Sequence, residues 1–433
     1  MAYWDGRPCG PENLRLFVPG EGWRLFADKV GEDQKVEAQG GRRLIESALL
    51  NALNATNLLV LTGSGSSFSA KNPVPVPPPP PKAPPPPKLT PAGMMDLWNA
   101  VKVKVGEATF QAVCDGFAEA PIDQNIERLL TLCKLYLELH ENAADAAFNQ
   151  TKKFVKDAED AILARVDFVD SETELVAHSA LITKIGRRGV RKPRAKLFTT
   201  NYDLCFEEAA RRHRFTIIDG FSHALDQIYD PLHFGYDIVR RDAGKEAPDY
   251  VENVFHLYKL HGSIDWRRVG SEIVRSRGDK GSPVLIYPRS SKYQESFEAP
   301  YLDMIGALQA ALREPDTALL VFGFGFNDDH LARPILSAVE TNMSLRLIIG
   351  DPAFLTSESL VAGDHSIARG KPMTNRFLRA FARLAESGDA RIHLINGRFD
   401  DMAAALPDLV GETDRERHAA RVRALRETGE GAA

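Results

Sequence analysis

Four clusters of glycine and polar residues each follow a short apolar run, and their residue types suit nucleotide binding and proton transfer. The first, GSGSS at 63–67, joins two glycines to small hydroxyls, so N–H and O–H groups could face a diphosphate. It lacks the GxGxxG spacing and the lysine of a P-loop. This loop alone therefore does not define a dinucleotide site.

The second and third clusters carry polar side chains at strand ends, where ligands of parallel sheets bind. FTTNYD at 198–203 offers Asn201 and Asp203, either of which could instead cap the following helix. LHG at 260–262 places His261 before a glycine, which suits a general base that a substrate approaches closely. A structural histidine is the alternative, and we expect His256 on the same strand to pack.

The fourth cluster, LLVFGFGFNDDH at 319–330, has glycines flanked by aromatic residues, as a nucleoside pocket would. Its residues Asn327, Asp328 and Asp329 could cap the next helix instead. Asp351 follows a further apolar run, LRLIIG, and is a weaker candidate for binding a ribose hydroxyl.

The elements that position these clusters are short apolar runs separated by helical patterns, which is typical of an α/β domain with a buried parallel sheet. A helix is predicted at Gly41 to Ala55, where apolar residues share one face. Strands are predicted at Asn57 to Thr62, Ala195 to Thr199, Phe215 to Asp219, Phe255 to Leu260, Val284 to Tyr287, Ala318 to Phe322, Leu345 to Ile349 and Arg391 to Ile395.

Two segments interrupt this alternation. Twelve prolines lie between Pro73 and Pro91, which predicts a polyproline II loop at 73–91, a spacer or else a ligand for an SH3-like partner. Residues 92–188 show helical periodicity without a convincing strand, so we predict an all-helical insert. The predicted order is an N-terminal arm at 1–40 that could dock on another subunit, a Rossmann-like domain at 41–72 and 189–410, and a C-terminal helix and tail at 411–433.

Composition excludes several classes of protein. The net charge of −5 over 433 residues gives no footprint for direct nucleic-acid or anionic-membrane binding. The longest apolar runs fall far short of the roughly 20 residues of a membrane helix, and the start shows no signal-peptide pattern. Four cysteines without a CxxC pair favour a reducing cytoplasm and no metal site.

The order of the clusters, GSGSS, TTNYD, LHG and GFGF, resembles the sirtuin-like (silent information regulator) superfamily, and in particular its divergent bacterial branch of anti-phage NADases. The resemblance covers Asn57 to Asp351. It implies a Rossmann-like parallel sheet of the sirtuin/DHS type with NAD+ as substrate and no metal. Carried over residue by residue, it puts the diphosphate on Gly63, Ser64, Gly65, Ser66 and Ser67, the nicotinamide ribose near Asn201 and Asp203, the base at His261, the adenosine side at Gly323 and Gly325, and a ribose hydroxyl at Asp351.

Two departures from the family pattern bear on the reaction. Sirtuin deacylases carry a four-cysteine zinc ribbon and a PDFR-containing cofactor loop, and this sequence has neither motif. We therefore expect an NAD+ glycohydrolase that releases ADP-ribose and nicotinamide, with Asn201 positioning ribose or water. A protein deacylase or ADP-ribosyltransferase, or a non-catalytic NAD/ADP-ribose sensing module, is the alternative. The resemblance also implies a homo-oligomer in antiviral defence, with a HerA-type ATPase or an Argonaute-like protein as partner.

Overall fold

The computed structural model describes residues 8–32, 34–73, 89–120, 122–140, 145–241, 249–276, 281–285, 299–355 and 375–409. Two predictions lie outside these ranges: the polyproline II conformation over 74–88, and the C-terminal helix and tail at 411–433. In the described residues, no helix is long and apolar enough to cross a membrane.

The core of the molecule is a nine-stranded sheet in the described residues, with the order β2-β1-β16-β15-β14-β5-β6-β10-β7. Seven of its strands run parallel, as predicted for a Rossmann-like domain. They are β5 (Asn57–Thr62), β6 (Lys196–Thr199), β7 (Thr216–Ile218), β10 (Val254–Lys259), β14 (Thr317–Phe322), β15 (Arg346–Gly350) and β16 (Ile392–Asn396). Each lies within one or two residues of its predicted bounds.

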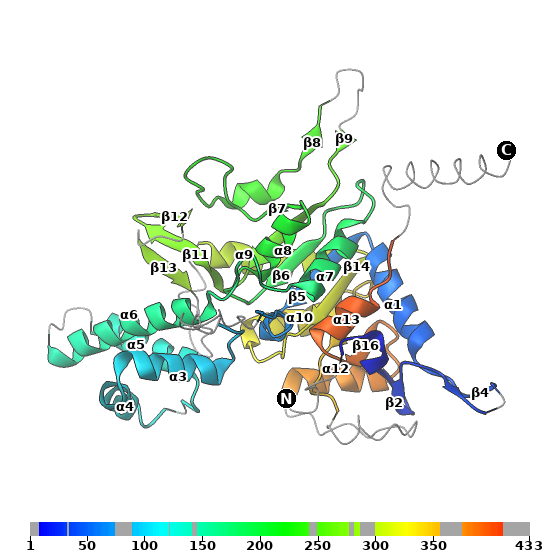
Figure 1. Cartoon of the computed structure of the whole chain (residues 1–433), viewed down its shortest axis with the longest axis horizontal. Helices are drawn as coiled ribbons and strands as arrows, with labels where there is room; N and C mark the ends of the chain where they lie inside the picture. Colours follow the sequence, from blue (N-terminus) through cyan, green and yellow to red (C-terminus); the bar gives the residue numbers. More distant parts are fainter. Residues whose placement is uncertain are drawn as a thin grey trace, which may run out of the picture.

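Both faces of this sheet are buried, because alternate residues of each strand point to opposite sides. In β5, Leu58 and Val60 join one apolar core, whereas Leu59 and Leu61 join the other. The first core is covered by α1 (Arg42–Asn54), α7 (Val176–Gly186), α8 (Cys205–Arg212) and α13 (Phe399–Ala405), and the second by α9 (Tyr301–Arg313), α10 (Asp329–Thr341) and α12 (Arg376–Glu386) (Figure 1). The result is a three-layer α/β/α domain, and α1 confirms the predicted first helix.

The strand order places a topological switch point between β5 and β14. From β5 the chain builds β6, β7 and β10 on one side, and it then returns to β14 on the other side of β5. Ligands of open α/β sheets bind in the crevice at the carboxyl ends of strands where the order reverses. The loops after β5 and β14 therefore bound the expected ligand crevice.

The predicted helical insert is present, with a boundary that differs from the prediction. Four helices, α3 (Met94–Val105), α4 (Glu107–Gly116), α5 (Ile126–Leu139) and α6 (Ala146–Val166), share their own apolar core and extend to one side of the sheet (Figure 1). In contrast, α7 packs on the sheet with Leu181 and Ile182. Helical periodicity does not reveal which core a helix faces, so the sequence assigned α7 to the insert.

The N-terminal segment, predicted as an arm at 1–40, pairs with the main sheet through its described residues. Strands β1 (Arg15–Val18) and β2 (Gly22–Leu25) extend the main sheet antiparallel beside β16, with Leu16 and Trp23 buried. Before them lies a short 3-10 helix, η2 (Pro11–Asn13), and after them the hairpin β3 (Lys29–Val30) and β4 (Val36–Ala38). Strands of four residues, half-buried at a sheet edge, leave too short an apolar pattern to detect.

The strand predicted at Val284 to Tyr287 does not join the parallel sheet. Residues Ser282–Leu285 form β13, which pairs antiparallel with β11 (Gly262–Val269), itself paired with β12 (Glu272–Arg275). Gly262 has φ +88°, which lets the chain turn out of the main sheet directly after β10. Smaller elements are the 3-10 helix η3 (Pro231–Gly235) and the hairpin of β8 (Val239–Arg240) and β9 (Asp249–Tyr250).

Candidate active site

The sheet register brings the predicted clusters together. Thr62, the last residue of β5, pairs with Thr199 of β6 and with Phe322 of β14, and Thr199 also pairs with Lys259 of β10. The residues that follow these strands, including Asn201 and His261, therefore emerge at the same edge of neighbouring strands. The GSGSS segment forms the short helix α2 (Ser64–Ser67) at this edge.

The loops after β5 and β14 pack directly on each other. The amide of Gly65 donates to the carbonyl of Gly323 at 3.0 Å. Gly323 has φ +70°, and a Cβ there would lie 2.7 Å from the amide nitrogen of Ser66. A Cβ on Gly65 would come equally close, 2.7 Å, to the Cα of Gly323. Glycine is therefore required at both positions for the two loops to meet at the switch point.

Two serines of the predicted phosphate loop make hydrogen bonds that hold the loop in place. The amide and hydroxyl of Ser66 both donate to the Gly63 carbonyl at 2.9 Å, and the Ser67 hydroxyl donates to Asp203. Ser64 is exposed, whereas Ser66 and Ser67 are buried. The hydroxyl of Thr62, at the base of the loop, is buried and has no hydrogen-bond partner among the described residues.

Asn201 is locked against this loop by its amide group. Its Nδ2 lies 2.9 Å from the Gly63 carbonyl, 2.9 Å from Ser66 Oγ and 2.8 Å from Ser67 Oγ. The carbonyl of Gly63 can only accept, so the NH₂ group must face the loop and Oδ1 must face away from it. Asn201 does not cap α8; it presents a fixed acceptor at the edge of the sheet.

Asp203 has two roles at the start of α8. Its Oδ1 accepts from the amide of Cys205, the first residue of that helix, at 3.0 Å, and its Oδ2 accepts from Ser67. The capping role considered from the sequence is therefore present at Asp203. The same carboxylate also ties the loop after β6 to the loop after β5.

His261 faces a second histidine that the sequence did not single out. Only 3 % of His261 is exposed, and its Nε2 lies 3.2 Å from Nε2 of His330 in the first turn of α10. Burial lowers the pKa of His261 to about 3. Burial, together with His261, lowers the pKa of His330 to about 4. Both imidazoles are therefore neutral at neutral pH, as a general base must be.

The insert contributes a buried carboxyl group that interacts with Asp328, the residue two before His330. The hydroxyl of Tyr202 donates to Glu127 Oε1 on α5 at 3.2 Å. Burial, and secondarily the nearby Asp328, raises the pKa of Glu127 to about 8. Burial also raises the pKa of Asp328, while His330 opposes that rise. No local sequence signal reveals Glu127 or His330 as site residues, because their partners lie 69 or more residues away.

The remaining predicted residues lie further along the same edge. Gly325 follows β14, and its carbonyl accepts from the Asn375 side chain at 3.2 Å. Its neighbours Phe324 and Phe326 are buried in the apolar core. Asp351 follows β15, where burial raises the pKa of its carboxyl to about 6 and the Ala353 amide donates to it at 2.7 Å.

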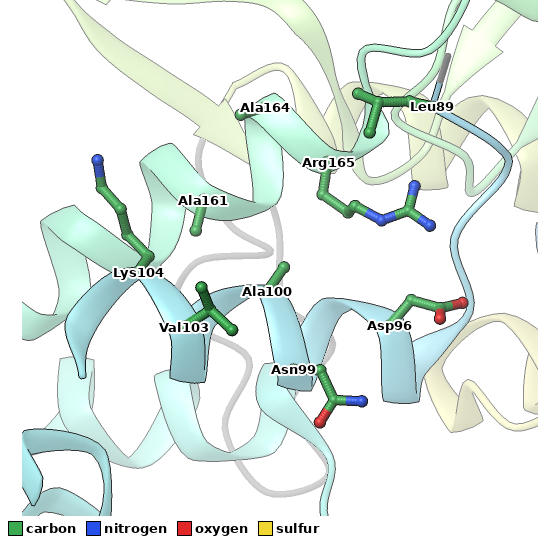
Figure 2. A pocket seen from close by; sticks show the side chains of 9 residues that line it. All are labelled: Leu89, Asp96, Asn99, Ala100, Val103, Lys104, Ala161, Ala164 and Arg165. Carbon is green, nitrogen blue, oxygen red and sulfur yellow. The ribbon is translucent and has the colours of Figure 1, made fainter. Parts of the chain in front are cut away.

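A roomy groove lies elsewhere, within the insert. It encloses about 510 Å³ between α3 and α6, and small or apolar side chains such as Ala100, Val103 and Ala161 line much of it (Figure 2). Two of its three charged side chains have local roles: Asp96 accepts from the Gly93 amide, and Arg165 donates to the Thr90 carbonyl. None of the residues at the sheet edge lines this groove.

The described residues contain no group of three or more His, Cys, Asp or Glu side chains placed to hold a metal ion. The four cysteines are unpaired; Cys133 and Cys205 are buried and Cys9 is exposed.

Comparison with known proteins agrees with this architecture. Residues 195–356 match the family model of the SIR2-like domain. The matched segment includes Asn201, Asp203, His261 and Gly323, while the fold brings Gly63 to Ser67 to it through β5. No curated protein matches the chain. Residues 195–356 are therefore similar to a SIR2-like domain within this Rossmann-like fold, and this class of domain points to an NAD-related function.

Proposed function

We propose that the protein is an NAD+ glycohydrolase, which converts NAD+ and water to ADP-ribose, nicotinamide and a proton. One observation carries the proposal. Asn201 presents a fixed side-chain acceptor after β6, and the buried His261 follows the neighbouring strand β10, where both strands end next to the switch point.

The groups at the sheet edge fit a dinucleotide. The unpartnered Thr62 hydroxyl and the exposed Ser64 hydroxyl lie where the diphosphate of NAD+ would cross the switch point. The acceptor of Asn201 suits a hydroxyl of the nicotinamide ribose or a water molecule beside it. Gly323 and Gly325 lie on the adenosine side, with Asp351 beyond them as the candidate for a ribose hydroxyl.

The reaction requires only a weak general base. The C1′–N bond breaks, its electron pair neutralises the pyridinium nitrogen, and positive charge develops on the ribose as in other glycosyl transfers. Water then bonds to C1′ and becomes strongly acidic as it does so. A weak base such as His261 is therefore sufficient to take its proton, provided that it is neutral and correctly placed.

The burial of the site favours water as the acceptor. His261 is almost fully enclosed, so a bulky acceptor such as a peptide lysine would have to displace the surrounding loops. Deacylation and ADP-ribosyl transfer are the outcomes that an acceptor test separates from hydrolysis.

Nicotinamide release from NAD+ by the purified chain, followed by chromatography with and without an acyl-lysine peptide, tests the proposal. We expect release without peptide, and a loss of at least about 100-fold in Asn201→Ala and His261→Ala. His256→Ala is the matched control, because His256 is a buried histidine on the same strand. Wild-type chain without release under any condition, or both site variants with wild-type rates, would contradict the proposal.

We propose further that this activity depletes NAD+ in the bacterial cytoplasm as an antiviral defence. The resemblance to the anti-phage branch supports this role, and an unrestrained NADase would harm its own cell. We therefore propose a homo-oligomer controlled by a partner such as a HerA-type ATPase or an Argonaute-like protein. Mass measurement of the purified chain, and NAD+ consumption with and without the product of the neighbouring gene, test the two ideas; a monomer unaffected by that product contradicts them.

A further inference from the structure

His261 and His330 share a hydrogen bond in which a single proton lies between the two Nε2 atoms. Two imidazole nitrogens 3.2 Å apart form a hydrogen bond only when one carries hydrogen and the other a lone pair. Both rings are neutral at neutral pH, so one is the Nε2–H tautomer and the other the Nδ1–H tautomer. His261 makes no hydrogen bond through Nδ1 to any described residue, which leaves that nitrogen for the substrate side.

A carboxylate is placed to hold a positive charge on His330. Asp328 is the N-cap residue of α10, yet its side chain makes no capping hydrogen bond, and it interacts electrostatically with His330. The neighbouring Asp329 instead forms an ion pair with Arg376 and lies 3.7 Å from Arg333. Among the described residues, Asp328 forms no ion pair with a lysine or arginine.

The other ionisable groups near the pair come from the insert and from the loop after β6. Glu127 on α5 interacts with Asp328 and accepts from Tyr202. At neutral pH Glu127 is protonated, because burial raises its pKa to about 8. Burial raises the pKa of Asp328 as well, but His330 opposes that rise, so a positive charge on His330 favours the ionised form of Asp328; Asp329 is a second, cation-paired carboxylate.

We propose that His330 is a positioning residue that receives a proton from His261 during NAD+ cleavage, and that Asp328 stabilises the charge that results. The inference rests on the proposed function. As water bonds to C1′, its O–H bond breaks and the proton passes to Nδ1 of His261. The Nε2–H proton of His261 passes to Nε2 of His330. His261 ends as the neutral Nδ1–H tautomer, and His330 ends as an imidazolium beside Asp328.

This transfer moves the positive charge away from His261, the more deeply buried of the two rings. A cation on His261 would be almost fully enclosed, whereas His330 is half-buried and next to a carboxylate. From Nδ1 of His330 a proton can leave to solvent, and the pair is reset once His261 releases its Nδ1 proton and takes back the Nε2 proton from His330. The order of burial thus gives the proton a direction, outward from the reacting centre.

The test compares His330→Gln and Asp328→Asn with wild type and with His256→Gln, a buried-histidine control outside the site. Glutamine can hydrogen-bond His261 but cannot take up a proton, so a purely structural His330 would be rescued by it. We expect both site variants to lose at least about tenfold in kcat for nicotinamide release, with KM within about twofold of wild type. Their kcat should rise from pH 7 to 9, because hydroxide can take up the proton that His261 no longer passes on, while wild type and His256→Gln stay level.

Wild-type kcat and a level pH profile in His330→Gln would overturn the relay. A second readout separates this result from failure of the proposed function. In chain labelled with 15N-histidine, His330→Leu removes the partner of His261 Nε2 and should shift the His261 nitrogen signals, whereas His256→Gln should not. If wild type releases no nicotinamide, the proposed function fails; unchanged His261 signals in His330→Leu would overturn the histidine pair itself.

Discussion

The carboxyl edge of the sheet and the groove of the insert differ in what they contain. The groove has an open volume of about 510 Å³, but small or apolar side chains line much of it, and its charged groups Asp96 and Arg165 serve local structure (Figure 2). The edge is crowded, and there Asn201, Asp203, His261 and His330 hold one another or the glycine loops within hydrogen-bond distance. Polar groups that converge at a switch point indicate chemistry, whereas volume alone does not.

The largest effect is expected at Gly323, because the carboxyl edge of the sheet depends on close packing of the loops after β5 and β14. Gly323→Ala should cost roughly 3–4 kcal/mol of stability, because alanine is strained at φ +70° and its Cβ would clash with the Ser66 backbone. Nicotinamide release should fall more than tenfold. Urea denaturation measures the first effect and chromatography the second.

Gly388→Ala is the matched control for this change. Gly388 has φ +91°, but a Cβ there would have no atom within 4 Å. It should therefore cost only about 1 kcal/mol, from backbone strain alone. Equal losses in the two variants would show that the loops after β5 and β14 do not need to touch.

At the junction between insert and sheet, Glu127→Gln should raise the stability of the folded chain at neutral pH. The folded chain binds a proton at Glu127 up to about pH 8, whereas the unfolded chain releases it near pH 4.5, so stability falls as pH rises between these values. Glutamine cannot ionise, so the variant should gain up to about 3 kcal/mol at pH 7.

Thermal unfolding at pH 5 and pH 7 measures this gain, which should be larger at pH 7. Glu138→Gln, an exposed position on the same helix, is the control and should change little. A Glu127→Gln variant that is no more stable than wild type at pH 7 would mean that the carboxyl is ionised in the folded chain.

A smaller effect is expected at His178, which lies between the Phe206 and Phe399 rings with no hydrogen-bond partner for either ring nitrogen among the described residues. Burial lowers its pKa to about 4, so the unfolded chain binds more protons between pH 4 and 6.5 and stability falls as pH drops through this window. His178→Leu should remove about 2 kcal/mol of the loss between pH 7 and pH 5. His213→Leu, at an exposed histidine, is the control and should lose as much stability between pH 7 and pH 5 as wild type. An equal loss in His178→Leu would contradict the lowered pKa of His178.

The smallest effect is expected in the groove. Ala164→Leu would fill part of the space between α3 and α6, where Ala164 is exposed. Stability should change by less than about 0.5 kcal/mol, and nicotinamide release should stay within about twofold of wild type. A tenfold rise in KM for NAD+ would show that the groove, and not the sheet edge, receives the substrate.

The sequence predicts the parts of this fold that follow from local pattern. Central strands such as β5 and β14 are continuous apolar runs because both of their faces are buried, so their bounds are found closely. Strand β1 was missed because it is short and half-buried, and α7 was assigned to the insert because periodicity does not name a partner.

The same division holds for the site. Strand-end motifs identify Asn201 and His261, and the parallel register then brings them to one edge. His330 and Glu127 could not be found in this way, because each acts through a contact that only the folded chain creates. His330 was seen only within a stretch that reads as a helix cap. The sequence also did not reveal that Phe324 and Phe326 belong to the apolar core, because burial depends on the helices that cover them.

The most direct test of the account is a structure of the His261→Ala variant with NAD+ bound. We predict the diphosphate between the loops after β5 and β14, and the nicotinamide ribose within about 3 Å of Asn201 Oδ1. NAD+ in the groove between α3 and α6, or a ribose that does not contact Asn201, would contradict the assignment of the active site to the sheet edge.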